Sequence, residues 1–356
     1  GIDRNARMGA LGNATAAGIC HSFSADGRCI TLLKVLFTNV CVFDCAYCAS
    51  RCSNDVPRAS FRPRELATSP WSFVPGAIYI EGLFLSSGVL KSPDYTTERI
   101  IECLRILREE YGFRGYIHAK AVPGTSSDLL AALGLLADRI SVNMELPSSE
   151  SLALLCPNKT RDSIVAPMRQ IREGIAEDRD TRALMRRDAC YMAQRRPARK
   201  TRAFAPAGQS TQMIIGATPE TDFQILNLSS SLYKTMHMKR VFFSAYLSVN
   251  EDGRLPQGNA VQLDREHRLY QPIGLCASIS STQRSSSMRP AVSCHRHRSE
   301  GELAINHLDR FPIEVNTAPY EELLRVPGIG VRGAKAIVGA RRATRLVKPS
   351  FASSAW

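Results

Sequence analysis

The sequence has no long apolar run. Its most hydrophobic segment, 73–85, is interrupted by Pro75, Gly76 and Glu81, so no stretch of 18 apolar residues is available to span a bilayer. The first residues also lack the charged and then apolar pattern of a secretory signal. We therefore expect a protein of the reducing cytoplasm without membrane contact, whose eleven cysteines include metal ligands or catalysts rather than disulfides.

The chain also has no acidic residue after Glu322, although seven lysines and arginines follow it. A second basic stretch, 159–202, holds 13 basic and six acidic residues, and the whole chain carries a net charge of +13. The rest of the chain is close to neutral, and two basic patches on a neutral body indicate a polyanionic partner such as nucleic acid. For the middle stretch, the alternative is a basic surface that only aids solubility.

Neither a single small module nor disorder over the whole length fits the composition. The 356 residues are 44% apolar and 22% charged, which is close to the average for globular proteins and sufficient for one large core plus a small one. Six short apolar, β-rich runs alternate with helical patterns, as in repeated βα units. These runs are 29–37, 77–85, 116–122, 139–146, 212–217 and 240–247.

Six βα units predict an α/β fold, either a partial TIM-like barrel or an open doubly wound sheet. In both, a ligand site lies at the carboxyl ends of the strands. We expect this domain to cover 18–270 and to include an exposed, Arg-rich excursion at 175–206. A Ser-rich irregular linker then occupies 271–304, and its Cys294 and His297 make a weak candidate for a metal site. A compact helical region follows at 305–345.

Three cysteines lie directly after the first predicted strand, in the octet Cys41-Val-Phe-Asp-Cys45-Ala-Tyr-Cys48. Three thiolates in one tight loop can ligate three irons of a [4Fe-4S] cluster and leave the fourth iron open, whereas a structural zinc site needs four ligands. The alternatives are a zinc knuckle completed by Cys52 or Cys29, or ordinary core cysteines.

This octet resembles the hallmark of the radical SAM superfamily, CxxxCxxC with an aromatic residue, here Tyr47, before the last cysteine. The resemblance implies a (βα)6 partial barrel in which Cys41, Cys45 and Cys48 hold the cluster. It also implies that S-adenosylmethionine (SAM) binds the open iron, and that one electron from a reductant such as flavodoxin or ferredoxin releases a 5′-deoxyadenosyl radical. The protein would orient the reactants and exclude water.

The resemblance assigns further SAM contacts at the strand ends. The turn after the second strand lacks the family's acidic residue, and serine hydroxyls and backbone carbonyls would replace it. Later contacts follow the fourth strand and the family's GxIxGxxE-like element on the fifth. The predicted SAM-binding residues are Tyr47, Ser86, Ser87, Gly88, Asn143, Glu145, Ile214 and Gly216.

Two titratable residues of the third predicted strand are candidates for catalysis. His118 and Lys120 alternate with apolar residues, so both side chains lie on one face of the sheet. There they would meet substrate or the SAM carboxylate. The alternatives are exposure to solvent or a hydrogen bond that merely satisfies a buried polar group.

The segment Val326-Pro-Gly-Ile-Gly330 separates two helical patterns and looks like a helix-hairpin-helix motif, whose second helix begins near Val331. Glycines in such a turn allow close approach of a phosphate to the amino end of the second helix. Phosphate contacts position a protein on DNA without reading its bases. The predicted DNA-binding residues are Pro327, Gly328, Ile329, Gly330, Arg332, Lys335 and Arg341. The alternative is a hairpin used only for packing or protein contact.

Together, these segments are similar to bacterial radical SAM proteins described as acting in DNA modification or repair. The similarity covers about 18–175, 204–270 and 305–342, and it departs in 271–304 and in the tail after Arg342, where the sequence reads as frameshifted or truncated coding sequence. It implies a radical SAM enzyme that modifies or repairs nucleic acid, with DNA as the first candidate. The alternatives are a radical SAM enzyme on a small molecule and a non-catalytic DNA-binding protein with a structural metal cluster.

Overall fold

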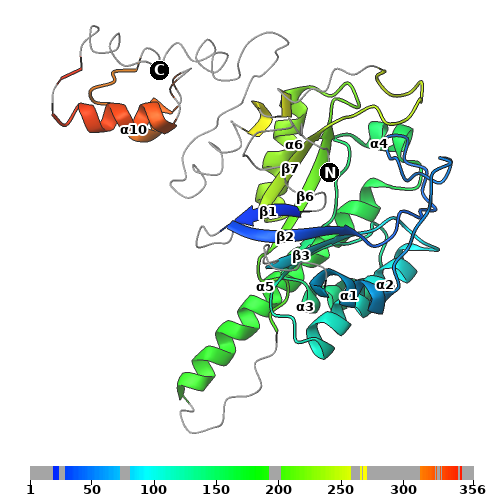
Figure 1. The fold of residues 1–356 in the computed structure, drawn as a ribbon. Coiled ribbons are helices and arrows are strands. Elements are labelled where there is room, and N and C mark those ends of the chain that lie inside the picture. The colour runs from blue at the N-terminus through cyan, green and yellow to red at the C-terminus, as the bar shows by residue number, and fades with distance from the viewer. Residues whose placement is uncertain are drawn as a thin grey trace. The chain divides into compact units, whose positions relative to one another are not determined.

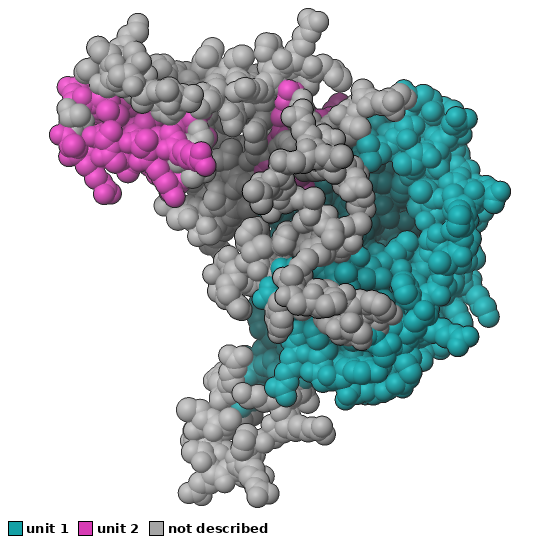
Figure 2. All heavy atoms as spheres, viewed as in Figure 1, with its two compact units in different colours: residues 1–219, 228–263 teal, residues 220–227, 264–356 magenta. Residues whose placement is uncertain are grey.

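The chain divides into two compact units, drawn in different colours in Figure 2. The first comprises 1–219 and 228–263, and the second comprises 220–227 and 264–356. The computed structural model describes residues 19–23, 29–72, 81–191, 202–257, 265–266, 268–270, 313–324, 326, 329, 331–343 and 345–346. The expected linker at 271–304, with Cys294 and His297, therefore lies outside the described residues.

A seven-stranded sheet in the strand order β1 to β7 forms the centre of the first unit (Figure 1). The strand β1 (Ile19–Phe23) pairs antiparallel with β2 (Cys29–Leu36). All later pairs are parallel, and their strands are β3 (Gly82–Ser86), β4 (Tyr116–Lys120), β5 (Arg139–Ser141), β6 (Gln209–Ile215) and β7 (Arg240–Ala245). Because this order never reverses, the six parallel strands make a curled half-barrel, which confirms the partial TIM-like prediction over the doubly wound one.

The fifth strand, β5, is shorter than its apolar run predicted. It ends at Ser141 instead of continuing to 146, and only Glu145 returns to the sheet, through an isolated bridge to Met213. Glu145 has a φ of +63°, a left-handed conformation that interrupts an extended strand. The backbone break places the Glu145 carboxylate at the carboxyl end of the sheet, among the residues predicted for the site.

Helices follow the strands as βα units require. They are α1 (Pro63–Ser72), α2 (Pro93–Arg105), α3 (Ser127–Leu136), α4 (Ser149–Leu155), α5 (Arg161–Tyr191) and α6 (Asp222–Thr235). Ser92 caps α2 by accepting a hydrogen bond from the Tyr95 amide. That helix continues as a π-helical turn, η1 (Ile106–Glu110), and Gly112, with a φ of +61°, stands just beyond it, as expected of a helix stop.

The Arg-rich excursion begins as helix rather than as irregular chain. Residues 175–191 continue α5, whose far end extends away from the sheet in Figure 1. This segment is rich in Arg and Ala, which are both strong helix formers. The expected exposure is present, since Leu184 and Met185 are 60% and 61% exposed.

The two faces of the parallel sheet differ in chemistry. Alternate residues such as Leu83, Ile117, Ile140, Met213 and Val241 are almost fully buried and form the apolar core. The opposite face carries polar, charged and aromatic side chains, and many of them are only partly buried. We call it the polar face; by strand register it includes Lys34, Phe84, His118, Lys120, Ser141, Ser210 and Gln212. The carboxyl-end residues Asn143 and Tyr246 continue this alternation.

The second unit has a small core of its own. Helix α10 (Val331–Ala340) and the short helix α9 (Tyr320–Leu323) bury Leu323, Ala334 and Ile337 together with Ala318. The helix predicted to start near Val331 does start there. None of the described helices combines the length and apolarity needed to cross a bilayer.

Candidate functional site

The three motif cysteines lie in one loop that leaves β2 and returns to α1. A bridge between Thr38 and Ser60 closes the base of this loop, which we call the cysteine loop (residues 38–60). Within it, the Arg58 guanidinium donates hydrogen bonds of 2.7–2.9 Å to four backbone carbonyl oxygens, those of Asn39, Ser50, Arg51 and Asn54. A planar group with five fixed donors suits such a task, so Arg58 holds both halves of the loop together.

A second clamp comes from the chain after β7. Asn250 Nδ2 donates to the carbonyl oxygens of Ala46 (2.7 Å) and Cys48 (3.0 Å). Asp252 accepts from Arg51 at 3.0 Å, and hydrogen bonds from Arg254 and Arg51 hold the pKa of its carboxyl below the usual range. Sequence reasoning missed Arg58, Asn250 and Asp252. The two later residues follow the last strand, where the fold places functional groups, but no motif connects them with a loop 200 residues earlier.

The thiols of the cysteine loop are free and receive backbone hydrogen bonds. The Val89 amide donates to Cys41 Sγ at 3.3 Å, and the Ser50 amide donates to Cys48 Sγ at 3.4 Å. Burial raises the pKa of the Cys48 thiol, and the nearby Cys45 and Cys41 thiols add to that rise, so the three sulfurs share one electrostatic environment. Backbone N–H groups directed at sulfur stabilise thiolate charge in the way that cluster ligands require.

A buried polar cluster lies behind Cys45. The Cys156 thiol donates a hydrogen bond to the Tyr47 hydroxyl at 3.1 Å and shares a hydrogen bond with the Cys45 thiol. Glu145 Oε1 accepts a hydrogen bond from Lys159 Nζ at 2.8 Å. Burial alone would raise the pKa of Glu145, but the Lys159 ammonium outweighs it and holds this pKa below the usual range. The predicted contact residues Tyr47 and Glu145 thus belong to one network, and Cys156 and Lys159 are members that the motif did not reveal.

The predicted turn after β3 packs directly against the cysteine loop. Gly88 donates its amide to the Thr38 carbonyl at 2.7 Å, and a Cβ at Gly88 would lie 2.5 Å from the Val40 carbonyl oxygen, so only glycine fits. Ser86 Oγ donates to the Val35 carbonyl at 3.2 Å. Ser87 Oγ is buried and has no hydrogen-bond partner among the described residues. Of the two serines, Ser87 is therefore the one with a hydroxyl available for a ligand.

Other strand ends bring further polar atoms to the same edge. Asn143 Oδ1 and the Tyr246 hydroxyl are both buried, and neither has a hydrogen-bond partner in the described part of the chain. Ile214 donates its amide to the Glu145 carbonyl at 2.7 Å, and Gly216 has a φ of +88° that favours glycine. Tyr246 was not predicted, although its place after the last strand is the signal that would have found it.

His118 and Lys120 lie on the polar face, as their alternation predicted, in different environments. The His118 ring stacks on Phe84 with centroids 4.3 Å apart, and its Nε2 is 2.9 Å from Ser141 Oγ. Burial lowers the pKa of His118 to about 3, so the ring is neutral at physiological pH. Lys120 Nζ is 3.4 Å from Gln212 Oε1, and burial lowers its pKa to about 8. Of the two, Lys120 is the one that changes charge near neutrality.

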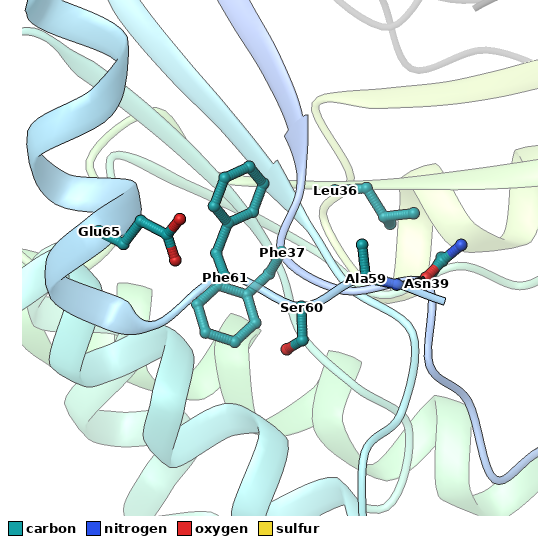
Figure 3. A pocket seen from close by; sticks show the side chains of 7 residues that line it. All are labelled: Leu36, Phe37, Asn39, Ala59, Ser60, Phe61 and Glu65. Atoms are coloured by element: carbon teal, nitrogen blue, oxygen red, sulfur yellow. Dashed lines mark hydrogen bonds between the residues drawn. The ribbon is translucent and has the colours of Figure 1, made fainter. Parts of the chain in front are cut away.

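A pocket of about 350 Å³ adjoins the base of the cysteine loop (Figure 3). Its walls include Leu36 at the end of β2, the rings of Phe37 and Phe61, and the Glu65 side chain. No predicted site residue lines this pocket, so it is separate from the strand-end residues described above.

In the second unit, the residues predicted to bind DNA differ in exposure and in their hydrogen bonds. Arg332 and Lys335 are exposed on α10, whereas Arg341 donates to the carbonyl oxygens of Val315 (3.0 Å) and Ala318 (2.6 Å). Arg341 therefore has a structural task within the unit that its predicted DNA contact did not include. Ile329 is partly buried against the small core, and its amide donates to the Val326 carbonyl. Pro327, Gly328 and Gly330 lie outside the described residues.

The donor chemistry of the cysteine loop fits an iron–sulfur cluster. Three free thiols share one loop, two of them accept backbone N–H bonds, and orphaned polar atoms of Ser87 and Asn143 lie at the strand ends beside it. Among the residues that the structure describes, no three His, Cys, Asp or Glu side chains converge as ligands of a single ion. The fit is thus one of ligand type and placement.

No family model matches the sequence, and no curated protein matches it. Several solved structures are similar at low identity. A methylornithine synthase (PylB) is 15% identical with a TM-score of 0.46, over 68% of this chain and 60% of that chain. The FeFe-hydrogenase maturase HydG from Carboxydothermus hydrogenoformans is 12% identical with a TM-score of 0.45, over 67% and 49%.

A cobalamin-dependent S-adenosylmethionine radical enzyme, OxsB, is 12% identical with a TM-score of 0.36, over 68% of this chain and 30% of that chain. This chain thus spans from 30% to 60% of the length of these three proteins. With TM-scores below 0.5, these matches do not identify the substrate or the reaction of this chain.

Proposed function

We propose that this chain is a radical SAM enzyme whose cluster is held by Cys41, Cys45 and Cys48. The observation that carries the proposal is the three free thiols in one braced loop, at the carboxyl end of a half-barrel strand. A [4Fe-4S] cluster with SAM supplies one-electron chemistry that abstracts hydrogen atoms from unreactive C–H bonds. An external one-electron donor, such as a flavodoxin or ferredoxin, has to supply the electron.

The residues around the loop have defined tasks in this proposal. Val89 and Ser50 stabilise thiolate charge through their amides, and Arg58 and Asn250 fix the backbone that carries the thiols. The buried hydroxyl of Ser87 and the amide oxygen of Asn143 bind polar groups of SAM, since each otherwise has no hydrogen-bond partner in the described chain. Gly88 allows the β3 turn to approach the loop closely enough for this.

We further propose that the substrate is nucleic acid, with DNA as the first candidate. The support comes from the second unit, where α10 exposes Arg332 and Lys335 on the side opposite its buried Ala334 and Ile337. Exposed arginine and lysine side chains near the amino end of a helix attract phosphate groups. The cytoplasm is the proposed compartment, because thiol ligands need a reducing environment.

Iron and sulfide content tests the cluster assignment. After anaerobic reconstitution, the wild-type chain should hold about four irons, and Ala at Cys41, Cys45 or Cys48 should remove most of them. Cys52 is the matched control, since it is a free and exposed thiol in the same loop, and Cys52→Ala should retain the full iron content. Equal iron content in all four variants would refute the assignment.

A further inference from the structure

Two lysines flank one aromatic ring on the polar face. Lys34 Nζ lies 5.6 Å from the centroid of the Phe84 ring, and Lys120 Nζ lies 5.8 Å from it. In the strand register, Lys34, Phe84 and His118 are neighbours on β2, β3 and β4. His118 stacks on the ring and is neutral. We call the two ammonium groups that lie over the ring the lysine pair; Arg139, next to His118 in the register, is a further positive charge nearby.

Neither lysine of the pair forms an ion pair with a carboxylate in the part of the chain that the structure describes. Among the described residues, the only hydrogen-bond partner of Lys120 Nζ is the Gln212 amide oxygen, at the long distance of 3.4 Å. Glu145 is the carboxylate that acts electrostatically on Lys120, but it forms an ion pair with Lys159 at 2.8 Å. Lys34 is exposed, but the Lys120 ammonium is desolvated by burial. An ammonium buried without a counter-charge costs the fold free energy, and proteins retain such groups mainly at functional sites.

Neutral hydrogen-bonding groups lie beside the lysine pair. The strand register places Lys120 next to Ser141, and Ser141 next to Ser210, in one row of the polar face. Ser210 is fully buried, and its hydroxyl has no hydrogen-bond partner in the described part of the chain. Ammonium groups together with hydroxyl donors are the usual surroundings of a bound phosphate.

We propose that Lys34 and Lys120 bind a phosphate group of the substrate on the polar face, with the Ser210 hydroxyl as a further donor. The inference rests on the proposed function for its setting, the half-barrel face beside the cysteine loop, but it needs neither a cluster nor SAM cleavage. The same oxyanion chemistry has a second source, the carboxylate of SAM. Lys34 lies on β2, three strands from β5, whose carboxyl end carries Asn143, and this separation favours the substrate.

Thymidine 5′-monophosphate and thymidine are suitable probes, because their difference in affinity isolates the phosphate and neither contains adenine. We would titrate each into the full-length reconstituted protein by calorimetry, without SAM or reductant. The monophosphate should bind at least roughly tenfold more tightly than the nucleoside. Lys34→Met and Lys120→Met should each remove most of that difference, and circular dichroism checks that both variants fold.

Lys91→Met is the matched control, because the Lys91 ammonium also lies over an aromatic ring, 5.0 Å from the Tyr95 centroid, at an exposed position just before α2. Lys91→Met should leave the ratio of the affinities for thymidine 5′-monophosphate and thymidine unchanged. Any phosphate binding by the second unit is the same in all variants, so it does not account for a difference between them. A ratio near one in the wild type, or an unchanged ratio in both lysine variants, would overturn the proposal. So would variants that weaken SAM binding while the phosphate preference persists, since the pair would then serve the SAM carboxylate.

Discussion

At the scale of single residues, the buried ammonium of Lys120 lowers the stability of the fold. Its pKa in the folded protein is about 8, below the ordinary value of 10.5, because burial and the neighbouring Lys34 disfavour the charged form while Glu145 partly offsets them. A group whose folded pKa is depressed binds its proton less tightly than in the unfolded chain. At pH 7, Lys120 therefore costs the fold free energy, and that cost declines as pH rises from about 8 towards 10.5.

Replacing this charge should stabilise the protein. We expect Lys120→Met to raise the free energy of unfolding at pH 7 by on the order of 1–3 kcal/mol, since methionine fills a similar volume without a charge to desolvate. Urea denaturation of the first unit's core would measure the change. A gain together with lost phosphate preference is the signature of a functional residue, whereas a less stable variant would show that Lys120 has a structural partner.

The same residue predicts a pH dependence of phosphate binding. The ammonium form attracts the phosphate, so affinity for thymidine 5′-monophosphate should fall as pH rises from 7 to 9. The other charged groups that act on Lys120 are Lys34 and the Lys159–Glu145 ion pair. The ion pair stays charged near pH 8 and His118 titrates only near pH 3, so neither opposes this trend. Calorimetry at several pH values tests it, and a flat profile in that range would show that Lys120 does not meet the phosphate.

At the scale of elements, the cysteine loop depends on side chains that hold its backbone. Arg58→Ala would leave four loop carbonyl oxygens without their donor, at about 1–3 kcal/mol for each one left buried. We expect this variant to take up less than half the wild-type iron, and Arg58→Lys to recover little, because an ammonium cannot reproduce the planar fork. Arg62→Ala, at an exposed position just past the loop, is the control that should keep full iron content.

The elements themselves were largely predictable. Each apolar run that suggested a strand overlaps one, because a parallel strand buried on its core face needs β-branched and aliphatic residues such as Val35 and Ile215. The ends of the strands were harder to predict. The strand β5 ends early and Glu145 beyond it adopts a left-handed conformation, which no local sequence pattern indicates. The helical continuation past residue 175 was not predicted, because the basic composition of 175–206 was interpreted only as exposure.

The site was predictable only where residues lie close together in sequence. The spacing of Cys41, Cys45 and Cys48 identified the loop, and alternation placed Lys120 on the correct face. Contacts between distant segments were not accessible, since nothing local relates Asn250 to Cys48 or Lys34 to Phe84. These pairings arise from strand order and register, which the chain adopts only when the whole sheet forms.

At the scale of the whole molecule, we propose that the second unit binds DNA through the exposed Arg332 and Lys335 of α10. The exposed bases of α10 should give duplex DNA binding that weakens with salt, because phosphate contacts release counterions. The double variant Arg332→Met, Lys335→Met should lower the slope of log affinity against log salt by about two. Arg341→Ala should instead destabilise the second unit, whose Val315 and Ala318 carbonyls it satisfies. An unchanged slope in the double variant would remove DNA from the proposed partners.

We propose that the three loop thiols support reductive cleavage of SAM, and 5′-deoxyadenosine is the most direct product to measure. Reconstituted protein, dithionite and SAM would be incubated without oxygen and the nucleoside quantified by chromatography. We predict its formation by the wild type and Cys52→Ala, and its absence from Cys41→Ala, Cys45→Ala and Cys48→Ala. Formation of 5′-deoxyadenosine at wild-type rates by any of these three variants, or a fully loaded wild-type cluster that leaves SAM intact, would contradict the account.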